Sequence, residues 1–271
     1  MEDIKTAFVL ITDEGYFQKA KKSIIDLRTK GLYQGDIVLI TINFNLNQNF
    51  KDFYSIIEVS FPEIDKSKMM NQIKERFPGG DGREFNKLNQ WEKLHVFDEY
   101  FLKWDRIVFI DSGLRILDTV QHLLDLDYKN CIIAPNDAGI HNHPDKVFKY
   151  QISHHNPELV EKLTVDFGKD ILESQYLLNC IWIYDTSILK ICDKYQLINA
   201  MNEYPLCKTN EMVIMNLLFH FKYKLWKQMP DYTSSGKYLF EWCELNHRPR
   251  NINWREICYI KYPITITFED T

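Results

Sequence analysis

The chain has 271 residues, of which 45% are hydrophobic and 26% are charged, a composition typical of a globular protein with a sizeable core. The net charge of -5 argues against a nucleic-acid partner, because a phosphate backbone requires a basic face. No apolar run reaches the ~18 residues of a membrane span, and the first residues lack the pattern of a secretory signal. Its six cysteines follow no metal or disulfide spacing. We therefore expect a cytoplasmic protein.

The first half of the chain alternates short apolar runs with amphipathic segments. Apolar runs of four to eight residues predict buried strands, and helical spacing of apolar residues predicts amphipathic helices. The predicted strands cover residues 7–11, 36–42, 55–59 and 106–110, and the predicted helices cover 17–28 and 91–101. This alternation is typical of an α/β protein with a mostly parallel sheet.

The second half of the chain mixes strands and helices less regularly. Strands are predicted at 131–134, 179–184 and 262–268, and a helix is predicted at 212–221. The sequence shows no internal repeat and no long linker rich in proline, glycine or serine. We therefore expect a single domain over 1–271, with a break near 126–130 between a first half, 1–128, and a second half, 129–271.

Asp111 directly follows the predicted strand at 106–110, and the small residues Ser112 and Gly113 come next. Ligands of open α/β sheets bind outside the carboxyl ends of the strands, so a carboxylate at this point can meet a ligand. The alternative is an Asx turn, in which the aspartate hydrogen-bonds to backbone two residues further on.

A second group of polar residues follows the first predicted strand. Thr12 and Asp13 end this strand, and Tyr16 precedes the first helix. An aromatic ring can stack on a base, while hydroxyl and carboxylate groups can hydrogen-bond to its edge. The alternative is a helix cap at Asp13 with Tyr16 packed on the core. The G-x-G-x-x-G and P-loop fingerprints are absent from this sequence.

Residues 77–83 contain three glycines beside cationic side chains. Arg83 and Lys87 are four residues apart, so a helix starting near Arg83 places both on one face, close to its positive N-terminal dipole. A diphosphate would be stabilised there. The alternative is a solvated face, because like charges at this spacing repel each other slightly.

These features together resemble the glycogenin-like retaining glycosyltransferases, family eight of the GT-A fold. The family has a Lys-Leu helix start, an apolar strand and an Asp-x-Asp motif, which match Lys87-Leu88 and Asp111-Ser112. Gly113 stands where the second aspartate is usual, so the motif is degenerate. The family's first loop holds uridine through a Thr, an Asn or Asp, and a Tyr. The matching residues here are Thr12, Asp13 and Tyr16.

The resemblance implies a GT-A nucleotide-diphospho-sugar transferase fold, with a mixed, mostly parallel central sheet flanked by helices. Residues 1–128 would then form the nucleotide- and donor-binding half, and residues 129–271 the acceptor half.

The second half carries looser matches to the same family. Residues 178–184 resemble the F-N-[AS]-G-V strand, in which Asn179 would face the sugar, although bulkier residues follow it. Residues 210–216 resemble the D-Q-x-x-L-N helix start, with Glu211 in the Asp position. Glu211 could orient an acceptor hydroxyl or stabilise charge at the anomeric carbon. Its alternative role is a first-turn carboxylate that complements the helix dipole. His247 stands for the family's late histidine.

The resemblance leaves two accounts of the leaving diphosphate. In one, Mn2+ or Mg2+ binds Asp111 and His247, as hard cations bind one or two carboxylates and the phosphates. In the other, fixed cations take this role without a metal. The candidate cations are Lys87, Arg248, Arg250 and Arg255.

The resulting hypothesis is a glycosyltransferase that moves a sugar from a nucleoside-diphosphate sugar, expected to be a UDP-sugar, to a hydroxyl of a glycan, protein or small molecule, with retention. The alternative is an inactive glycosyltransferase-like protein that binds nucleotide or glycan. The predicted catalytic residues are Asp111, Lys87 and Glu211. The predicted nucleotide-binding residues are Thr12, Asp13, Tyr16, Arg83, Lys87, Asp111, Ser112 and Gly113. The predicted sugar- or acceptor-binding residues are Asn179, Glu211 and His247.

Overall fold

The computed structural model describes residues 4–76, 88–138, 146–208, 210–242 and 254–261. Its centre is a seven-stranded sheet with the strand order β3-β2-β1-β4-β7-β6-β8. Strands β3, β2, β1 and β4 are parallel, β7 is antiparallel to β4 and β6, and β8 is parallel to β6. The strands are β1 (Thr6–Asp13), β2 (Asp36–Ile42), β3 (Ile56–Val59), β4 (Arg106–Ile110), β6 (Ile132–Ala134), β7 (Ile181–Asp185) and β8 (Trp226–Gln228). The mixed, mostly parallel sheet predicted from the sequence is therefore confirmed.

The predicted strands agree closely with the observed ones. Strands β2 and β4 have the predicted bounds, and their interiors are fully buried. The strand predicted at 179–184 begins later, at Ile181, so Asn179 lies in the bend that precedes β7. The strand predicted at 262–268 lies outside the described residues.

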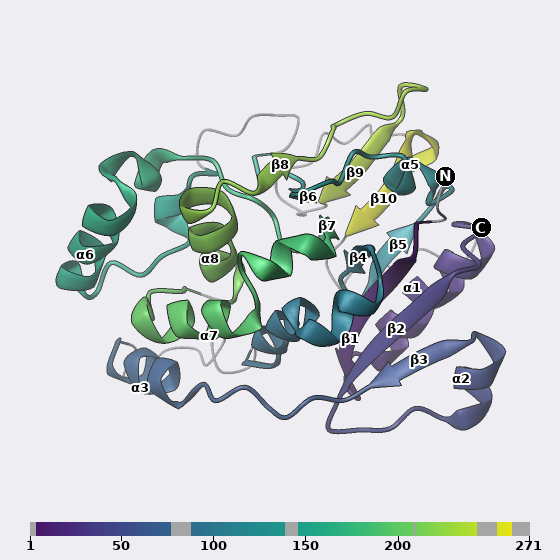
Figure 1. Cartoon of the computed structure of the whole chain (residues 1–271), viewed down its shortest axis with the longest axis horizontal. Helices are drawn as coiled ribbons and strands as arrows, with labels where there is room; N and C mark the ends of the chain where they lie inside the picture. Colours follow the sequence, from purple (N-terminus) through teal and green to yellow (C-terminus); the bar gives the residue numbers. More distant parts are fainter. Residues whose placement is uncertain (1–3, 77–87, 139–145, 209, 243–253, 262–271) are drawn as a thin grey trace.

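Helices pack on both sides of the central sheet. Figure 1 shows α1 and α2 beside β1 to β3, and α6, α7 and α8 together at the opposite end of the sheet. The predicted helix at 91–101 consists of two 3-10 segments, η1 and η2, rather than an α-helix. The α-helices are α1 (Phe17–Thr29), α2 (Gln48–Phe53), α3 (Ser67–Arg76), α5 (Gln121–Leu124), α6 (Pro157–Phe167), α7 (Lys194–Glu203) and α8 (Met212–Met215). The other helical segments are η1 (Leu88–Phe97), η2 (Glu99–Lys103), η3 (Phe148–Tyr150), η4 (Lys169–Glu173), η5 (Thr186–Lys190), the π-helix η6 (Asn216–Lys222) and η7 (Trp254–Glu256).

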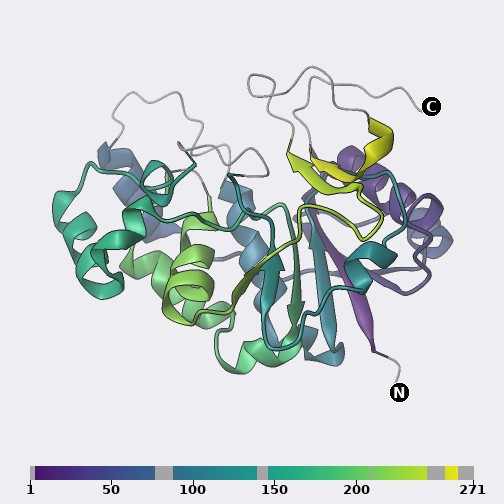
Figure 2. The same cartoon turned by 90° about the horizontal axis from the view of Figure 1, so that it is seen from above.

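A second sheet of three strands adds to the predicted architecture. It comprises β5 (Leu114–Ile116), β10 (Ile257–Lys261) and β9 (Tyr238–Trp242), in the order β5-β10-β9. Figure 2 shows this sheet beyond the end of the central sheet toward which β1 runs. Since β5 follows β4 after a short turn, the C-terminal strand β10 is held close to the end of β4.

Strand order fixes the place of a ligand site. The chain runs from β1 outward to β2 and β3, then returns to the other side of β1 as β4. In open α/β sheets, ligands bind outside the carboxyl ends of strands at such a reversal of strand order. Asp13 and Asp111 stand at or just beyond these two neighbouring strand ends.

One hydrophobic core includes residues from both halves of the chain, among them Phe109 and Trp182, whose rings stack at 3.8 Å between centroids. Within the described residues, no helix combines the length and the apolar character needed to cross a membrane.

Candidate active site

Asp111 lies at the carboxyl end of β4 and is fixed there by backbone contacts. Its N–H donates to the carbonyl of Cys180 at 2.8 Å, which ties the end of β4 to the segment before β7. The hydroxyl of Ser112 donates to the carbonyl of Ile11 at 2.7 Å, which ties the same turn to β1. The N–H of Gly113 donates to Ser23 Oγ at 3.2 Å. An Asx turn at Asp111 would need the Gly113 N–H to donate to the Asp111 carboxylate. Because this N–H donates to Ser23 instead, the Asx turn is not formed.

The carboxylate of Asp111 faces two lysines from distant parts of the chain. Lys93 Nζ lies 3.1 Å from Oδ1, and Lys261 Nζ lies 2.8 Å from Oδ2. The Asp111 side chain is 21% exposed, so the end of the strand is still accessible. Burial by itself raises the pKa of Asp111, but Lys261 and Lys93 outweigh burial and hold the pKa below its ordinary value. Asp111 is therefore an anion at neutral pH.

Lys93 joins Asp111 to a second, deeper carboxylate. Its Nζ lies 3.3 Å from Glu211 Oε1 and donates to the carbonyl of Asn179 at 3.5 Å. Burial by itself lowers the pKa of Lys93, yet the two carboxylates raise it above its ordinary value. A buried lysine stays charged only when it is paired in this way. The ammonium of Lys93 therefore has three acceptors for its three N–H groups.

Glu211 is fully buried, and its two oxygens differ in their contacts. Oε1 accepts a hydrogen bond from Asn179 Nδ2, whereas Oε2 has no hydrogen-bond partner among the described residues. Burial raises the pKa of Glu211, although the nearby Lys93 opposes this shift. Glu211 stands at the N-cap of α8, but its side chain makes no capping hydrogen bond. This position at the start of α8 is also that of a carboxylate that complements the helix dipole, so both roles considered for Glu211 stay predictions.

The sequence of η1 explains why Lys93 is buried. Trp91 and Leu94, on either side of it, are fully or almost fully buried in the core, and Lys93 itself is 4% exposed. Sequence reasoning selected Lys87 and missed Lys93 and Lys261 as partners of Asp111. The available signal for Lys93 was its place between the apolar residues Trp91 and Leu94 of a predicted core-facing helix, because a buried lysine requires an anionic partner.

The predicted nucleotide loop lies next to Asp111 at the end of β1. Thr12 is buried, and its hydroxyl donates to the carbonyl of Asp13 at 2.9 Å. Asp13 accepts the N–H of Tyr16 at 2.9 Å through Oδ1 and Asn89 Nδ2 at 2.8 Å through Oδ2. The Tyr16 ring is 48% exposed, and Lys19 Nζ lies 4.3 Å from its centroid. An exposed ring at a strand end suits stacking on a base.

Several predicted site residues cannot be placed. Arg83, Lys87, His247, Arg248 and Arg250 lie outside the described residues, so their predicted roles stay predictions. Arg255 is described and is exposed on η7.

The described residues around Asp111 do not fit a divalent cation. Hard cations take several oxygen ligands, but both oxygens of Asp111 face lysine ammonium groups. Lys93 Nζ contacts both Asp111 and Glu211, and so it occupies the position that an ion bridging these carboxylates would need.

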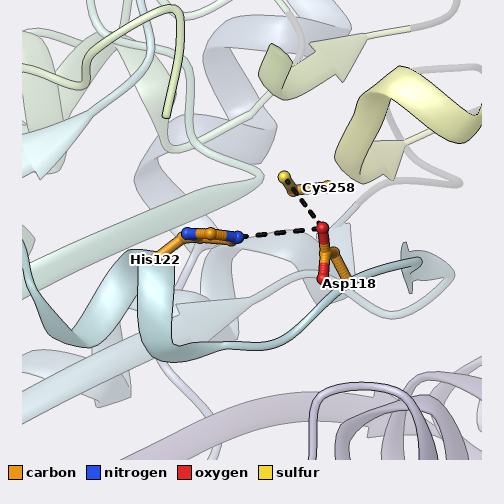
Figure 3. A group of neighbouring side chains, drawn as sticks. All are labelled: Asp118, His122 and Cys258. Atoms are coloured by element: carbon orange, nitrogen blue, oxygen red, sulfur yellow. Dashed lines mark hydrogen bonds and ion pairs between the residues drawn. The ribbon is translucent and has the colours of Figure 1, made fainter. Parts of the chain in front are cut away.

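A separate cluster of possible ligands lies beside the small sheet. Asp118, His122 and Cys258 have ligand atoms within 4.8 Å of one another, and no other such group of three occurs in the described part of the chain. Figure 3 shows one carboxylate oxygen of Asp118, Oδ2, in contact with both His122 and Cys258. Lys237 Nζ lies 2.6 Å from Asp118 Oδ2, and burial raises the pKa of Cys258 to about 11. These contacts indicate a protonated thiol and a carboxylate neutralised by lysine.

Comparison with known proteins supports the fold. No protein-family model and no curated protein matches the sequence. Similar solved structures include the bifunctional WbbM apo structure, with a TM-score of 0.59 and 13% identity over 95% of this chain and 45% of WbbM. The galactosyltransferase LgtC with donor and acceptor sugar analogs has a TM-score of 0.56 and 10% identity, over 87% of this chain and 75% of LgtC. Core-mannan synthase A (CmsA/Ktr4) from Aspergillus fumigatus, in its Mn/GDP form, has a TM-score of 0.51 and 8% identity, over 84% of this chain and 73% of the synthase.

The chain therefore spans less than half the length of WbbM but most of the length of LgtC. Identities this low establish the fold alone. The chain has the GT-A-type fold of these glycosyltransferases, as the sequence predicted. The narrower resemblance to family eight stays a prediction.

Proposed function

We propose that this chain is a glycosyltransferase that moves a sugar from a nucleoside-diphosphate sugar, with UDP as the expected nucleotide, to a hydroxyl acceptor. The observation that carries the proposal is the position of Asp111. It lies where the strand order reverses, is accessible, and is paired with Lys261, a partly exposed lysine that a diphosphate can contact. The GT-A-type fold supports a nucleoside-diphosphate sugar as the ligand at this position.

Within this proposal, the loop after β1 binds the nucleoside. Tyr16 stacks on the base, and Thr12 and Asp13 shape the loop around it. The exposed ring of Tyr16 supports this role, as do the internal hydrogen bonds that hold the loop in place. Ser112 and Gly113 bring the backbone of the next strand end close to the same loop.

The sugar is assigned to the surroundings of Lys93, near Asn179 and Glu211. Glu211 Oε2 is buried and lacks a partner among the described residues, so in this proposal it accepts from a sugar or acceptor hydroxyl once the bound sugar displaces the cover that Lys93 provides. We propose a retaining reaction, in which the leaving phosphate and the incoming hydroxyl share one face of the sugar. Such a route needs no strongly placed general base, which agrees with a Glu211 carboxylate already engaged by Lys93.

The test is hydrolysis of, or transfer from, a set of UDP-sugars by the purified chain. Asp111→Asn keeps the shape of the side chain and removes its charge, and turnover should fall about a hundredfold or more. Asp170→Asn, at an exposed carboxylate in η4, is the matched control and should leave turnover unchanged. Circular dichroism should show that both variants are folded.

Two results would contradict the proposal in different ways. If the wild-type chain binds UDP but turns over no sugar nucleotide, the alternative of an inactive nucleotide-binding protein is correct. If it neither binds nor uses any nucleoside diphosphate, the assignment of the site at Asp111 is wrong.

A further inference from the structure

Three lysines from distant segments meet at the end of β4. Lys93 comes from η1, Lys261 is the last residue of β10, and Lys19 comes from α1. Lys93 and Lys261 contact Asp111 directly. The side chain of Lys19 lies against Gly113, where a Cβ atom would meet its carbon atoms at 3.4 and 3.5 Å. Three ammonium groups therefore lie near Asp111, more than are required to neutralise its single negative charge.

The three lysines differ in how many of their hydrogen-bond donors are already used. An ammonium group has three N–H donors. Lys93 has three acceptors, which are Asp111, Glu211 and the Asn179 carbonyl. Lys261 has two, Asp111 Oδ2 at 2.8 Å and the Ser112 carbonyl at 2.6 Å. Its third N–H has no acceptor among the described residues, and its side chain is 16% exposed, so a ligand can accept from it.

The ammonium group of Lys19 has fewer partners among the described residues than that of Lys261. It makes no ion pair within the described residues, and its Nζ lies over the Tyr16 ring. Burial and the positive charge of Lys261 lower the pKa of Lys19, and the negative charge of Asp111 offsets only part of this shift. Two cations that repel each other in this way would both be stabilised by an anion between them.

The lysines and carboxylates near the site differ in how far they are already paired. The cations are Lys19, Lys93 and Lys261. The carboxylates are Asp111, Glu211, which lies behind Lys93, and Asp13, whose two oxygens accept from the Tyr16 N–H and from Asn89 Nδ2. Among the described residues, the ammonium donors left over are those of Lys19 and Lys261, beside the ring assigned to the base. A group with two adjacent negative phosphates fits these donors.

We infer that Lys261 and Lys19 bind the diphosphate of the nucleotide directly, and that this chain binds nucleoside diphosphates without a divalent cation. The inference rests on the proposed function and names the residues that take the place of the metal. Asp111 then acts as a positioning residue that holds Lys261, while Lys93 holds Asp111 in turn. Fixed ammonium groups can stabilise the charge that grows on a leaving diphosphate.

The experiment is calorimetric titration of the wild-type chain with UDP, uridine and pyrophosphate in excess EDTA, repeated with Mn2+. UDP should bind in EDTA about tenfold or more tightly than uridine, because charged hydrogen bonds to the phosphates add affinity. Pyrophosphate should bind in EDTA as well. Adding Mn2+ should change the UDP dissociation constant by less than about threefold.

Variants at the two lysines separate the diphosphate from the nucleoside. Lys261→Met and Lys19→Met should each weaken UDP binding in EDTA about tenfold and leave uridine binding within about twofold. Lys261→Arg keeps the charge and should restore most of the affinity, which excludes a merely structural effect on β10. Lys22→Met, at an exposed lysine of α1, is the control and should bind UDP like the wild type.

The outcomes separate this inference from the proposed function. UDP binding that requires Mn2+ would overturn the inference and leave the proposed function standing. UDP binding in EDTA that is insensitive to both lysine variants would also overturn it. No binding of UDP or pyrophosphate under either condition would overturn both.

Discussion

The ammonium of Lys93 lies 3.3 Å from Glu211 Oε1, and both side chains are almost completely shielded from solvent. Charges in such a place interact strongly, because little water screens them. The same ammonium also contacts Asp111 at the strand end. The accessible carboxylate of the site is therefore connected to the deepest one through a single lysine.

Removing Lys93 should leave two carboxylates without a shared cation. Lys93→Met is expected to cost about 3–5 kcal/mol of unfolding free energy, since breaking a buried pair strands a charge. Glu211→Gln should cost less than about 2 kcal/mol, because an amide oxygen can still accept from Asn179. The double variant should lose about 1–3 kcal/mol less than the sum of the two. Urea unfolding at pH 7 measures all three, and additive losses would mean that the pair is not coupled.

Asn216 should be important for stability, although it is not one of the predicted site residues. Its Oδ1 accepts the N–H of Leu177 at 2.8 Å, and its Nδ2 donates to the Leu177 carbonyl at 3.0 Å. These bonds hold the segment that leads to Asn179. Asn216→Ala would leave buried backbone groups unpaired, so we expect a loss of about 2–4 kcal/mol. Asn49→Ala on exposed α2 is the control, and equal urea midpoints for the two variants would contradict the prediction.

Local sequence patterns were sufficient for six of the seven strands of the central sheet, whereas the short edge strand β8 was not predicted. Strands β2 and β4 are apolar runs that begin at Asp36 and Arg106, and these charged residues mark the strand starts in both sequence and structure. Burial on both faces needs only such a run, so a local pattern is informative. The position of Asp111 follows directly from the end of β4.

The residues around Asp111 could not be derived in the same way. Lys261 reaches it because β10 pairs with β5, and β5 is a three-residue strand far away along the chain. No local feature at residue 261 indicates this pairing, since β-pairing between distant segments depends on the whole fold. Lys93 could have been found from its apolar neighbours, but the Lys-Leu match to the family pattern selected Lys87 instead.

His220 should make the stability of the protein fall in mild acid. Its ring packs against Phe221 and Trp226, with centroids 4.2 and 4.6 Å away. Burial, with a smaller contribution from the charge of Lys224, lowers the pKa of His220 to about 4. The unfolded chain has the ordinary histidine pKa of about 6.5, so it binds more protons than the folded chain between these values. The stability associated with neutral His220 is thus complete above pH 6.5 and is lost as the pH falls toward 4.

Replacing His220 by glutamine should remove this pH dependence. Each pKa unit corresponds to about 1.4 kcal/mol, and partial exposure reduces the effect, so the loss between pH 7 and pH 4.5 should be about 2 kcal/mol smaller in His220→Gln than in the wild type. Urea unfolding at the two pH values gives the comparison. His154→Gln, at an exposed histidine, should keep the wild-type pH dependence. A wild-type slope in His220→Gln would show that another group is responsible.

An aspartate at position 113, where the predicted Asp-x-Asp motif has its second carboxylate, should not create a metal site. Gly113 has a φ of +86°, and residues with a Cβ atom adopt this conformation at a cost of roughly 1–2 kcal/mol. Gly113→Asp and Gly113→Ala should therefore both lower the unfolding free energy by about that amount.

The carboxylate introduced by Gly113→Asp would also lie against the Lys19 side chain and neutralise it. We expect Gly113→Asp to weaken UDP binding in EDTA about tenfold more than Gly113→Ala does, and Mn2+ should not reverse the loss. Tighter UDP binding by Gly113→Asp when Mn2+ is added would show instead that Asp111 can accept a metal once a second carboxylate is present.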